Sequence, residues 1–277
     1  MALVWFAALG SATPAIALIQ GLRDLGWVEG ETIAMAQRSA EGQHEQLLGA
    51  GDSGAIPAAY HATRTIPIVM TVSGDPVRAG YITSLAQPGG TITGLTLMVP
   101  ELAGKRLQLL TAAMPGVARG AVLGPSTQYE WSALAEATQA LGLQLHAFRV
   151  DSPDAFEPAF TAAMRAHADA LLVLPSPLTH RFRRRIVDLA TQSRLPARYP
   201  LKEYVEAGGL MADGWSISAL YRCAATSVDK ILKGATPADL PVERPTTFEL
   251  VINLKTAQAL DLIIPPVLLF QADEVLR

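Results

Sequence analysis

The sequence is poor in cysteine, in charged residues and in long apolar runs. Its single cysteine, Cys223, excludes an intramolecular disulfide and a thiolate metal cluster. Only 17% of the 277 residues are charged, and the net charge of −3 provides no basic field that would attract nucleic acid. Beyond the N-terminal segment, no apolar run reaches the roughly 18 residues that a membrane-spanning helix needs. These absences argue against nucleic-acid-binding, disulfide-stabilised and helical membrane proteins.

What is present indicates a globular protein of about two domains. Half of the residues are hydrophobic, enough for a sizeable core, and roughly 150 residues make one domain. The apolar start, Met1 to Ala17, superficially suggests a signal peptide, but the first cation is Arg23, so the positive region is absent. We therefore favour a buried strand from Leu3 to Leu9 that ends in a turn, and find no convincing export signal.

Strand-like and helix-like segments alternate along the chain. Residues 67–72 form an apolar strand that ends in the turn cluster Ser73-Gly74-Asp75-Pro76, and residues 131–141 have helical apolar spacing that ends at Gly142. Strands that alternate with helices pair in parallel, so the predicted fold class is α/β. Further strands are predicted at 92–98, 120–123, 143–150 and 170–174, and further helices at 14–25, 78–86, 101–114, 153–167, 179–193 and 218–233.

The two halves of the chain resemble copies of each other. Each contains a helix that ends in Leu-Gly and, later, a short entry to a strand through an apolar residue and proline. Gly26 and Pro67 are 41 positions apart, whereas Gly142 and Pro196 are 54 apart, so the first copy is shorter by 13 positions. We expect the first lobe to lack a counterpart of the strand at 170–174, unless the two-residue signals match by coincidence.

The loops after the predicted strands are rich in hydroxyl groups. Ligands of open parallel sheets bind at the carboxyl ends of the strands, where hydroxyls and free N–H groups suit a carboxylate. Asp75 is the acidic residue among these loops and could pair with an ammonium group, so together the loops would suit an amino acid. The alternative is that these residues are ordinary helix caps. The loop candidates are Ser11, Thr13, Ser73, Asp75, Ser126 and Ser176.

A search for catalytic or metal-binding motifs finds none. The five histidines have no metal-binding spacing, and neither a hydrolase nucleophile elbow nor a phosphate-binding loop is present. We therefore expect no catalytic residue, no metal and no cofactor. Cys223 is expected to be a small buried group, and Tyr199, Tyr204 and Trp215 to be core residues or the lining of an apolar pocket. The arginines at 181 and 183–185 are expected to form a solvated helix face, with contact to a partner or an anion as the alternative.

Several segments follow a recognisable order over nearly the whole chain. They are 21–30 (GLRDLGWVEG), 40–43 (AEGQ), 66–69 (IPIV), 74–77 (GDPV), 87–94 (QPGGTITG), 199–200 (YP), 203–211 (EYVEAGGLM) and 245–255 (PTTFELVINLK). In this order they resemble the ABC-transporter substrate-binding protein family that includes tryptophan and tyrosine/phenylalanine binders.

The resemblance implies a type I periplasmic-binding-protein fold. Two Rossmann-like lobes with parallel sheets flanked by helices would be joined by a three-crossover hinge. We assign residues 1–97 and 209–238 to the N-terminal lobe, and residues 98–208 and 239–277 to the C-terminal lobe. The chain departs from the family between Gln43 and Ile56, where a helix, a strand and a loop are usual, and this agrees with the missing strand inferred above.

The resemblance also implies a function: binding of a small solute in the interlobe cleft, and docking on ABC permease subunits at the membrane. The ligand-binding candidates are then the loop residues above together with Glu203. Family members act in the periplasm or anchored outside the cytoplasm. We expect a monomer or weak dimer without a nucleic-acid partner. Alternatives are a cytosolic ligand-sensing domain, a degraded paralogue that no longer binds, and a small-molecule α/β enzyme.

Overall fold

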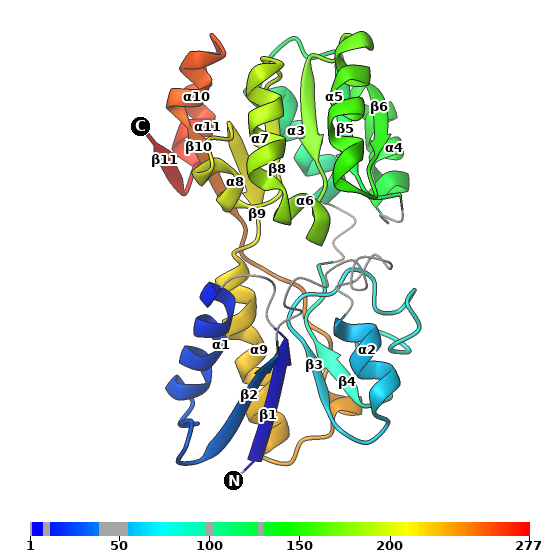
Figure 1. The fold of residues 1–277 in the computed structure, drawn as a ribbon, viewed down its shortest axis with the longest axis vertical. Helices are drawn as coiled ribbons and strands as arrows, with labels where there is room; N and C mark the ends of the chain where they lie inside the picture. The colour runs from blue at the N-terminus through cyan, green and yellow to red at the C-terminus, as the bar shows by residue number, and fades with distance from the viewer. Residues whose placement is uncertain (1, 8–11, 39–54, 98–101, 127–129) are drawn as a thin grey trace. The chain divides into compact units, whose positions relative to one another are not determined.

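The structure is a computed structural model that describes residues 2–7, 12–38, 55–97, 102–126 and 130–277 (Figure 1). The chain divides into two compact units, each made of two separate pieces of sequence. Unit 1 contains Met1–Met98 and Ile217–Thr246, and unit 2 contains Val99–Ser216 and Thr247–Arg277. The chain therefore passes three times from one unit to the other.

Unit 2 is built on a seven-stranded sheet with the strand order β11-β10-β9-β8-β7-β5-β6. Strands β5 to β9 run parallel, β10 is antiparallel to β9, and β11 is parallel to β10. The strands are β5 (Arg119–Gly124), β6 (Gln144–Arg149), β7 (Ala170–Val173), β8 (Ala197–Tyr199), β9 (Met211–Gly214), β10 (Glu249–Asn253) and β11 (Glu274–Leu276). The α-helices are α3 (Leu102–Ala113), α4 (Glu130–Leu141), α5 (Phe156–Arg165), α6 (Pro177–Arg181), α7 (Arg183–Gln192), α8 (Lys202–Glu206), α10 (Leu254–Ala259) and α11 (Pro266–Gln271), with a short 3-10 helix η2 (Pro153–Ala155).

Local sequence explains these elements. Strand β7 is the apolar run Ala-Leu-Leu-Val, and all four residues are buried, as expected of a central strand covered on both faces. Helix α4 is followed by Gly142, whose φ of +65° suits glycine after the end of a helix. Asn253 ends β10 and caps α10 by accepting a hydrogen bond from the Thr256 N–H at 3.2 Å. The unit 2 core joins strand residues such as Val122 and Leu172 to Leu107 of α3.

Unit 1 contains two pairs of parallel strands, β1–β2 and β3–β4, among its described residues. Gly94 in β4 has φ of +127°, and a Cβ there would collide with the backbone of Met70 in β3, so only glycine allows this close pairing. Its elements are β1 (Ala2–Ala7), α1 (Ala12–Asp24), β2 (Ile33–Arg38), α2 (Ala55–Ala62), β3 (Ile68–Met70), β4 (Ile92–Gly94), α9 (Ile217–Leu232) and the 3-10 helix η3 (Pro237–Asp239).

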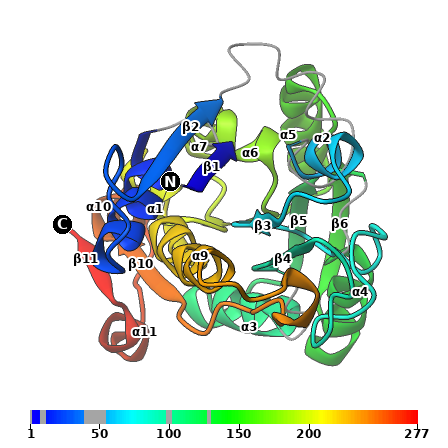
Figure 2. The same ribbon diagram turned by 90° about the horizontal axis from the view of Figure 1, so that it is seen from below.

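Helices α1 and α9 lie side by side in unit 1, although about 200 residues separate them in the sequence (Figures 1 and 2). A Cβ on Gly21 would lie only 2.9 Å from the Cβ of Ala225, so the glycine allows the two helices to approach closely. The Trp27 Nε1–H donates to an Asp229 carboxylate oxygen at 2.9 Å. These contacts attach the later piece of unit 1 to its N-terminal piece.

The units differ from the expected lobes at two places. Residues 209–216 belong to unit 2, because β9 pairs with β8 and β10. Residues 239–246 belong to unit 1, where the Val242 N–H donates to the Leu85 carbonyl at 2.8 Å. The helix predicted at 78–86 is wrong, since that segment is a series of turns and bends. The prediction that the first lobe lacks one strand concerns residues 44–55. Nearly all of these residues lie outside the described part of the chain.

Candidate functional site

Three predicted ligand-binding residues of unit 2 follow strands that are neighbours in the sheet. Ser126 follows β5, Ser176 follows β7 and Glu203 follows β8, and these strands are adjacent and parallel in the order β8-β7-β5. The carboxyl ends of parallel neighbours meet at one edge, which is where open α/β sheets bind ligands. We call this edge of unit 2 the carboxyl edge.

Ser126 is bound to a side chain of the next loop. Its N–H donates to Asp151 Oδ1 at 2.9 Å, and its hydroxyl donates to Asp151 Oδ2. Asp151 follows β6, the neighbour of β5, so this pair joins two adjacent strand-end loops. The Ser126 hydroxyl therefore has a local structural partner at the carboxyl edge.

Ser176 is the N-cap of helix α6. Its Oγ accepts a hydrogen bond from the Thr179 N–H at 3.0 Å, and the Thr179 hydroxyl lies 3.1 Å from the Ser176 N–H, which completes a capping box. Thr179 is fully buried, and its hydroxyl also lies 3.0 Å from the Leu174 carbonyl. This arrangement fixes the loop that leaves β7.

Glu203 lies in the first turn of α8 and is half-buried. Its carboxylate has no hydrogen bond or ion pair with any residue that the structure describes. Of the three predicted residues at the carboxyl edge, it is the one whose functional group is not engaged by a described neighbour.

In unit 1, two predicted residues lie in the loop that follows β3. Ser73 is buried, and its carbonyl accepts from the Leu97 N–H at 2.7 Å. Asp75 is half-buried, and its Oδ1 accepts from the Arg78 N–H at 2.9 Å, which stabilises the turn. Thr13 lies in the first turn of α1, and Ser11 lies outside the described residues.

Unit 2 contains a cluster of buried charged residues that the sequence analysis missed. Arg106 of α3 pairs with Glu130 at the start of α4, and Arg198 of β8 pairs with Asp213 of β9. Each of these four side chains is at most 10% exposed, and the Arg106 guanidinium lies 5.3 Å from the ring centre of Trp215. We call these four residues the buried charge cluster.

The environment of Arg198 disfavours its positive charge. Burial lowers the pKa of the Arg198 guanidinium, the negative charge of Asp213 raises it, and the positive charge of Arg106 lowers it. The negative charge of Glu130 also raises it, so all three other members of the buried charge cluster act on Arg198. One sign of this cluster was visible in the sequence, because Arg198 interrupts an apolar strand pattern.

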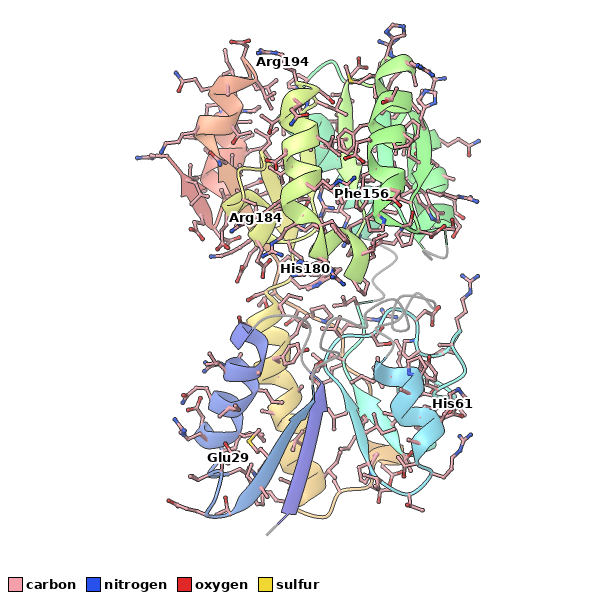
Figure 3. All side chains as sticks on the ribbon, viewed as in Figure 1. Glu29, His61, Phe156, His180, Arg184 and Arg194 are labelled. Atoms are coloured by element: carbon pink, nitrogen blue, oxygen red, sulfur yellow. The ribbon has the colours of Figure 1, made fainter. Side chains whose placement is uncertain are left out.

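An aromatic group lies beside α6. Tyr199 and Tyr204 stack with ring centres 5.0 Å apart, and His180 meets Tyr204 edge-on at 6.2 Å (Figure 3 labels His180). Burial, followed by the nearby charge of Arg183, lowers the pKa of His180 to about 4, so its imidazole is neutral near pH 7. Tyr199, Tyr204 and Trp215 are all buried, as core residues would be.

A hollow of about 360 Å³ lies at the opposite edge of the unit 2 sheet. It lies near the amino ends of β8 and β9 and is lined by residues that include Arg194 and Lys255. It is therefore separate from the candidate residues of the carboxyl edge. Among the described residues, no group of histidine, cysteine, aspartate and glutamate could hold a metal ion, and no helix could cross a membrane.

Comparison with known proteins identifies relatives over almost the entire chain. A model of the family described as ABC transporter substrate binding protein matches residues 17–276. A tyrosine-binding protein of Clostridioides difficile (strain R20291) is 24% identical over 274 residues, which cover 88% of this chain and 75% of that protein.

Two solved structures have a closely similar fold. A conserved domain protein of Vibrio cholerae has a TM-score of 0.88 at 23% identity, with 99% of each chain covered. An ABC domain from Streptococcus pneumonia in complex with L-Trp has a TM-score of 0.85 at 25% identity, with 99% of this chain and 98% of that chain covered. These similarities confirm the predicted two-lobed α/β fold of the type I periplasmic-binding-protein class.

Proposed function

Because the chain belongs to the ABC transporter substrate binding protein family, we propose that it is the solute-binding component of an ABC import system and binds an aromatic amino acid. The observation that carries this proposal is the family match over residues 17–276. The ligand class is supported by two relatives, one described as tyrosine-binding and one solved with L-Trp.

The proposed ligand contacts come from both units. Asp75 of unit 1 pairs with the ligand ammonium, and the hydroxyl and N–H groups of the strand-end loops interact with its polar groups. Ser11, Thr13, Ser73, Ser126, Ser176 and Glu203 complete the proposed set of contacts. Ligand binding closes the lobes, because a ligand that contacts both lobes favours the conformation in which both contacts form.

The protein is proposed to do no chemistry on its ligand. This proposal rests on the family, which is a substrate-binding family. The proposed partner is an ABC permease, and the proposed site of action lies outside the cytoplasm, as for other members of the family. We propose a monomer or weak dimer.

The test is a thermal-shift screen of the purified protein against the twenty amino acids, followed by calorimetry on those that bind. A ligand at about 100 times its Kd stabilises the folded protein by about 2.7 kcal/mol, which raises the unfolding midpoint by several degrees. We expect L-tryptophan, L-tyrosine or L-phenylalanine to raise the midpoint, and L-lysine and L-aspartate to leave it unchanged.

Two outcomes would contradict the proposal. A folded protein that binds no amino acid would instead be a paralogue that has lost binding. Turnover of a bound amino acid, measured by mass spectrometry after incubation, would indicate an enzyme.

A further inference from the structure

Arg198 is a fully buried arginine with an unused hydrogen-bond donor. Its Nε donates to Asp213 Oδ1 and its Nη2 donates to the Asp213 carbonyl, but its Nη1 has no partner among the described residues. A buried charged donor without a partner destabilises a protein, so most such groups in native structures are satisfied. The free Nη1 therefore requires an explanation.

The unused donor of Arg198 suits a carboxylate. The buried charge cluster contains two guanidinium groups and two carboxylates, and each carboxylate is paired with one guanidinium. Within the cluster, Arg106 lowers the pKa of Arg198 and Glu130 raises it, so their effects on Arg198 oppose each other. A carboxylate placed against Arg198 Nη1 would satisfy the donor, and a planar guanidinium binds carboxylates with favourable geometry.

The position of Arg198 fits the ligand-binding edge. The end of β9 approaches the end of β8 so closely that a Cβ on Gly214 would collide with the Pro200 carbonyl. Arg198 and Asp213 therefore lie in adjacent strands next to the carboxyl edge. Trp215 follows this point, with its ring over Arg106 and 6.5 Å from the ring of Phe248, so aromatic surface lies next to the charges.

From these observations we infer that Arg198 binds the carboxylate of the ligand through Nη1. The inference rests on the proposed solute-binding function and specifies which ligand group unit 2 recognises. It assigns the carboxylate to an arginine that the sequence analysis did not single out. Because Arg198 is fully covered, the covering side chains must move before the carboxylate can bind, and association should be slower than diffusion allows.

The first test needs no variant. Calorimetry on the wild-type protein compares L-tryptophan, L-tryptophanamide, which lacks the carboxylate, and indole-3-propionate, which lacks the ammonium. Hydrogen bonds to charged groups correspond to about 10- to 150-fold in affinity, so the amide should bind weaker by such a factor. Equal affinity of the acid and the amide would overturn this inference and leave the proposed function intact. If neither L-tryptophan nor any other aromatic amino acid binds, both proposals are wrong.

The second test identifies the residue. Arg198→Lys keeps the positive charge but loses Nη1, so it should reduce the acid-to-amide affinity ratio by roughly tenfold or more. The control is Arg185→Lys, since Arg185 pairs with Glu157 on the surface, and it should leave the ratio unchanged. If a folded Arg198→Lys protein keeps the wild-type acid-to-amide affinity ratio, the inference is contradicted. A purely structural role of Arg198 would change the affinities for the acid and for the amide by the same factor and would therefore leave their ratio unchanged.

A second variant covers the case in which Arg198→Lys does not fold. The double substitution Arg198→Met/Asp213→Leu removes both charges of a buried pair, and well-packed hydrophobic replacements of such pairs are often tolerated. It should fold and bind L-tryptophan and L-tryptophanamide with nearly equal affinity. Retention of the wild-type acid-to-amide ratio by this variant would also overturn the inference.

Discussion

At the residue scale, polar side chains at the strand ends have local partners. Ser126 bonds to Asp151, Ser176 caps α6, and Asp75 accepts the Arg78 N–H. Each bond fixes a loop next to the carboxyl end of a strand, so these residues position backbone N–H groups as well as their own side chains. A local structural role and a ligand-binding role are compatible, and substitutions must therefore separate the two.

Two substitutions of Asp75 distinguish the role of its negative charge from the role of its hydrogen bond in the turn. Asp75→Asn keeps an oxygen that can accept the Arg78 N–H but removes the negative charge, whereas Asp75→Ala removes both. If Asp75 pairs with the ligand ammonium, both variants should bind L-tryptophan about 10-fold or more weakly, and only Asp75→Ala should lower the unfolding midpoint. Calorimetry and thermal melts measure the two effects, and unchanged affinity in Asp75→Asn would reject the ionic role.

The lowered pKa of His180 predicts that the stability of the protein depends on pH. Its pKa is about 4 in the folded protein and about 6.5 when unfolded, so between these values the unfolded state binds more protons. Stability should therefore fall as the pH falls from about 6.5 to 4, by at most about 3 kcal/mol from this group.

The variant His180→Phe isolates this effect, because phenylalanine can keep the edge-on contact with Tyr204 and does not titrate. Urea unfolding at pH 7.0, 5.5 and 4.5 should show a smaller loss of stability in the variant than in the wild type. Parallel pH profiles for the two proteins would show that His180 does not titrate with a lowered pKa.

The exposure of Cys223 could not be predicted from the sequence. Cys223 was expected to be a small buried group, but it is exposed on α9, so that prediction is wrong. Its neighbours Ala224 and Ala225 are buried, and Ala225 faces Gly21 of α1. Which face of α9 is covered depends on where α1 packs, and the sequence of α9 alone does not state this.

At the element scale, the close approach of α1 and α9 predicts that replacing glycine by alanine has opposite effects on stability at Gly21 and at Gly104. A Cβ at Gly21 would lie 2.9 Å from the Ala225 Cβ and 3.2 Å from the Arg222 carbonyl oxygen, whereas a Cβ at Gly104 in α3 would meet only the Ala137 Cβ at 3.9 Å. Gly21→Ala should destabilise the protein by about 1 kcal/mol through overpacking, and Gly104→Ala should stabilise it by up to about 1 kcal/mol.

Denaturant unfolding of both variants tests this difference. The double variant Gly21→Ala/Ala225→Gly restores space between the helices and should be less destabilised than the sum of its single substitutions predicts. If Gly21→Ala is at least as stable as Gly104→Ala, the helices do not pack as closely as the structure indicates.

The buried ion pairs are also a feature at this scale, since each joins two elements. Arg106–Glu130 joins α3 to α4, and Arg198–Asp213 joins β8 to β9. Removing one partner of such a pair generally costs about 3–5 kcal/mol, because the other charge remains buried. This cost is the reason for testing Arg198 with a charge-retaining lysine and with a double substitution.

At the scale of the whole molecule, two units with separate cores are joined by three passages of the chain. The unit 2 core includes Leu107, Val122 and Leu172, whereas a unit 1 core includes Met70, Ile92 and Val242. Val242 comes from the later piece of unit 1, so each unit needs both of its pieces. Truncating the chain at any one passage is therefore expected to remove residues that one of the units requires.

Ligand-driven closure makes a prediction at the same scale. If the ligand contacts both units, L-tryptophan should lower the radius of gyration in small-angle X-ray scattering. L-lysine, which we expect not to bind, is the control. Calorimetric binding of L-tryptophan without any change in the scattering curve would show that the ligand is held without closure.

The sequence by itself determined the fold class and the family. Apolar strands, glycine stops and proline-containing turns are local signals, and they placed β3, α4 and β7 and gave the alternation of an α/β fold. Ser126 and Ser176 could be predicted to lie at the carboxyl ends of strands because each follows an apolar strand segment, whereas Glu203 was added only with the family resemblance. The family resemblance depended on ordered segments spread along the chain, which the sequence contains in full.

Only the tertiary structure decided which strands are neighbours and which charges are buried together. Strand β9 pairs with β8 on one side and antiparallel β10 on the other, so residues 209–216 belong to unit 2 and not to the first lobe. Arg106 and Glu130 are 24 residues apart in the sequence, and Arg198 and Asp213 are 15 apart. No local pattern encodes such pairings, because they depend on how distant segments pack, and packing alone makes Arg198 a buried donor.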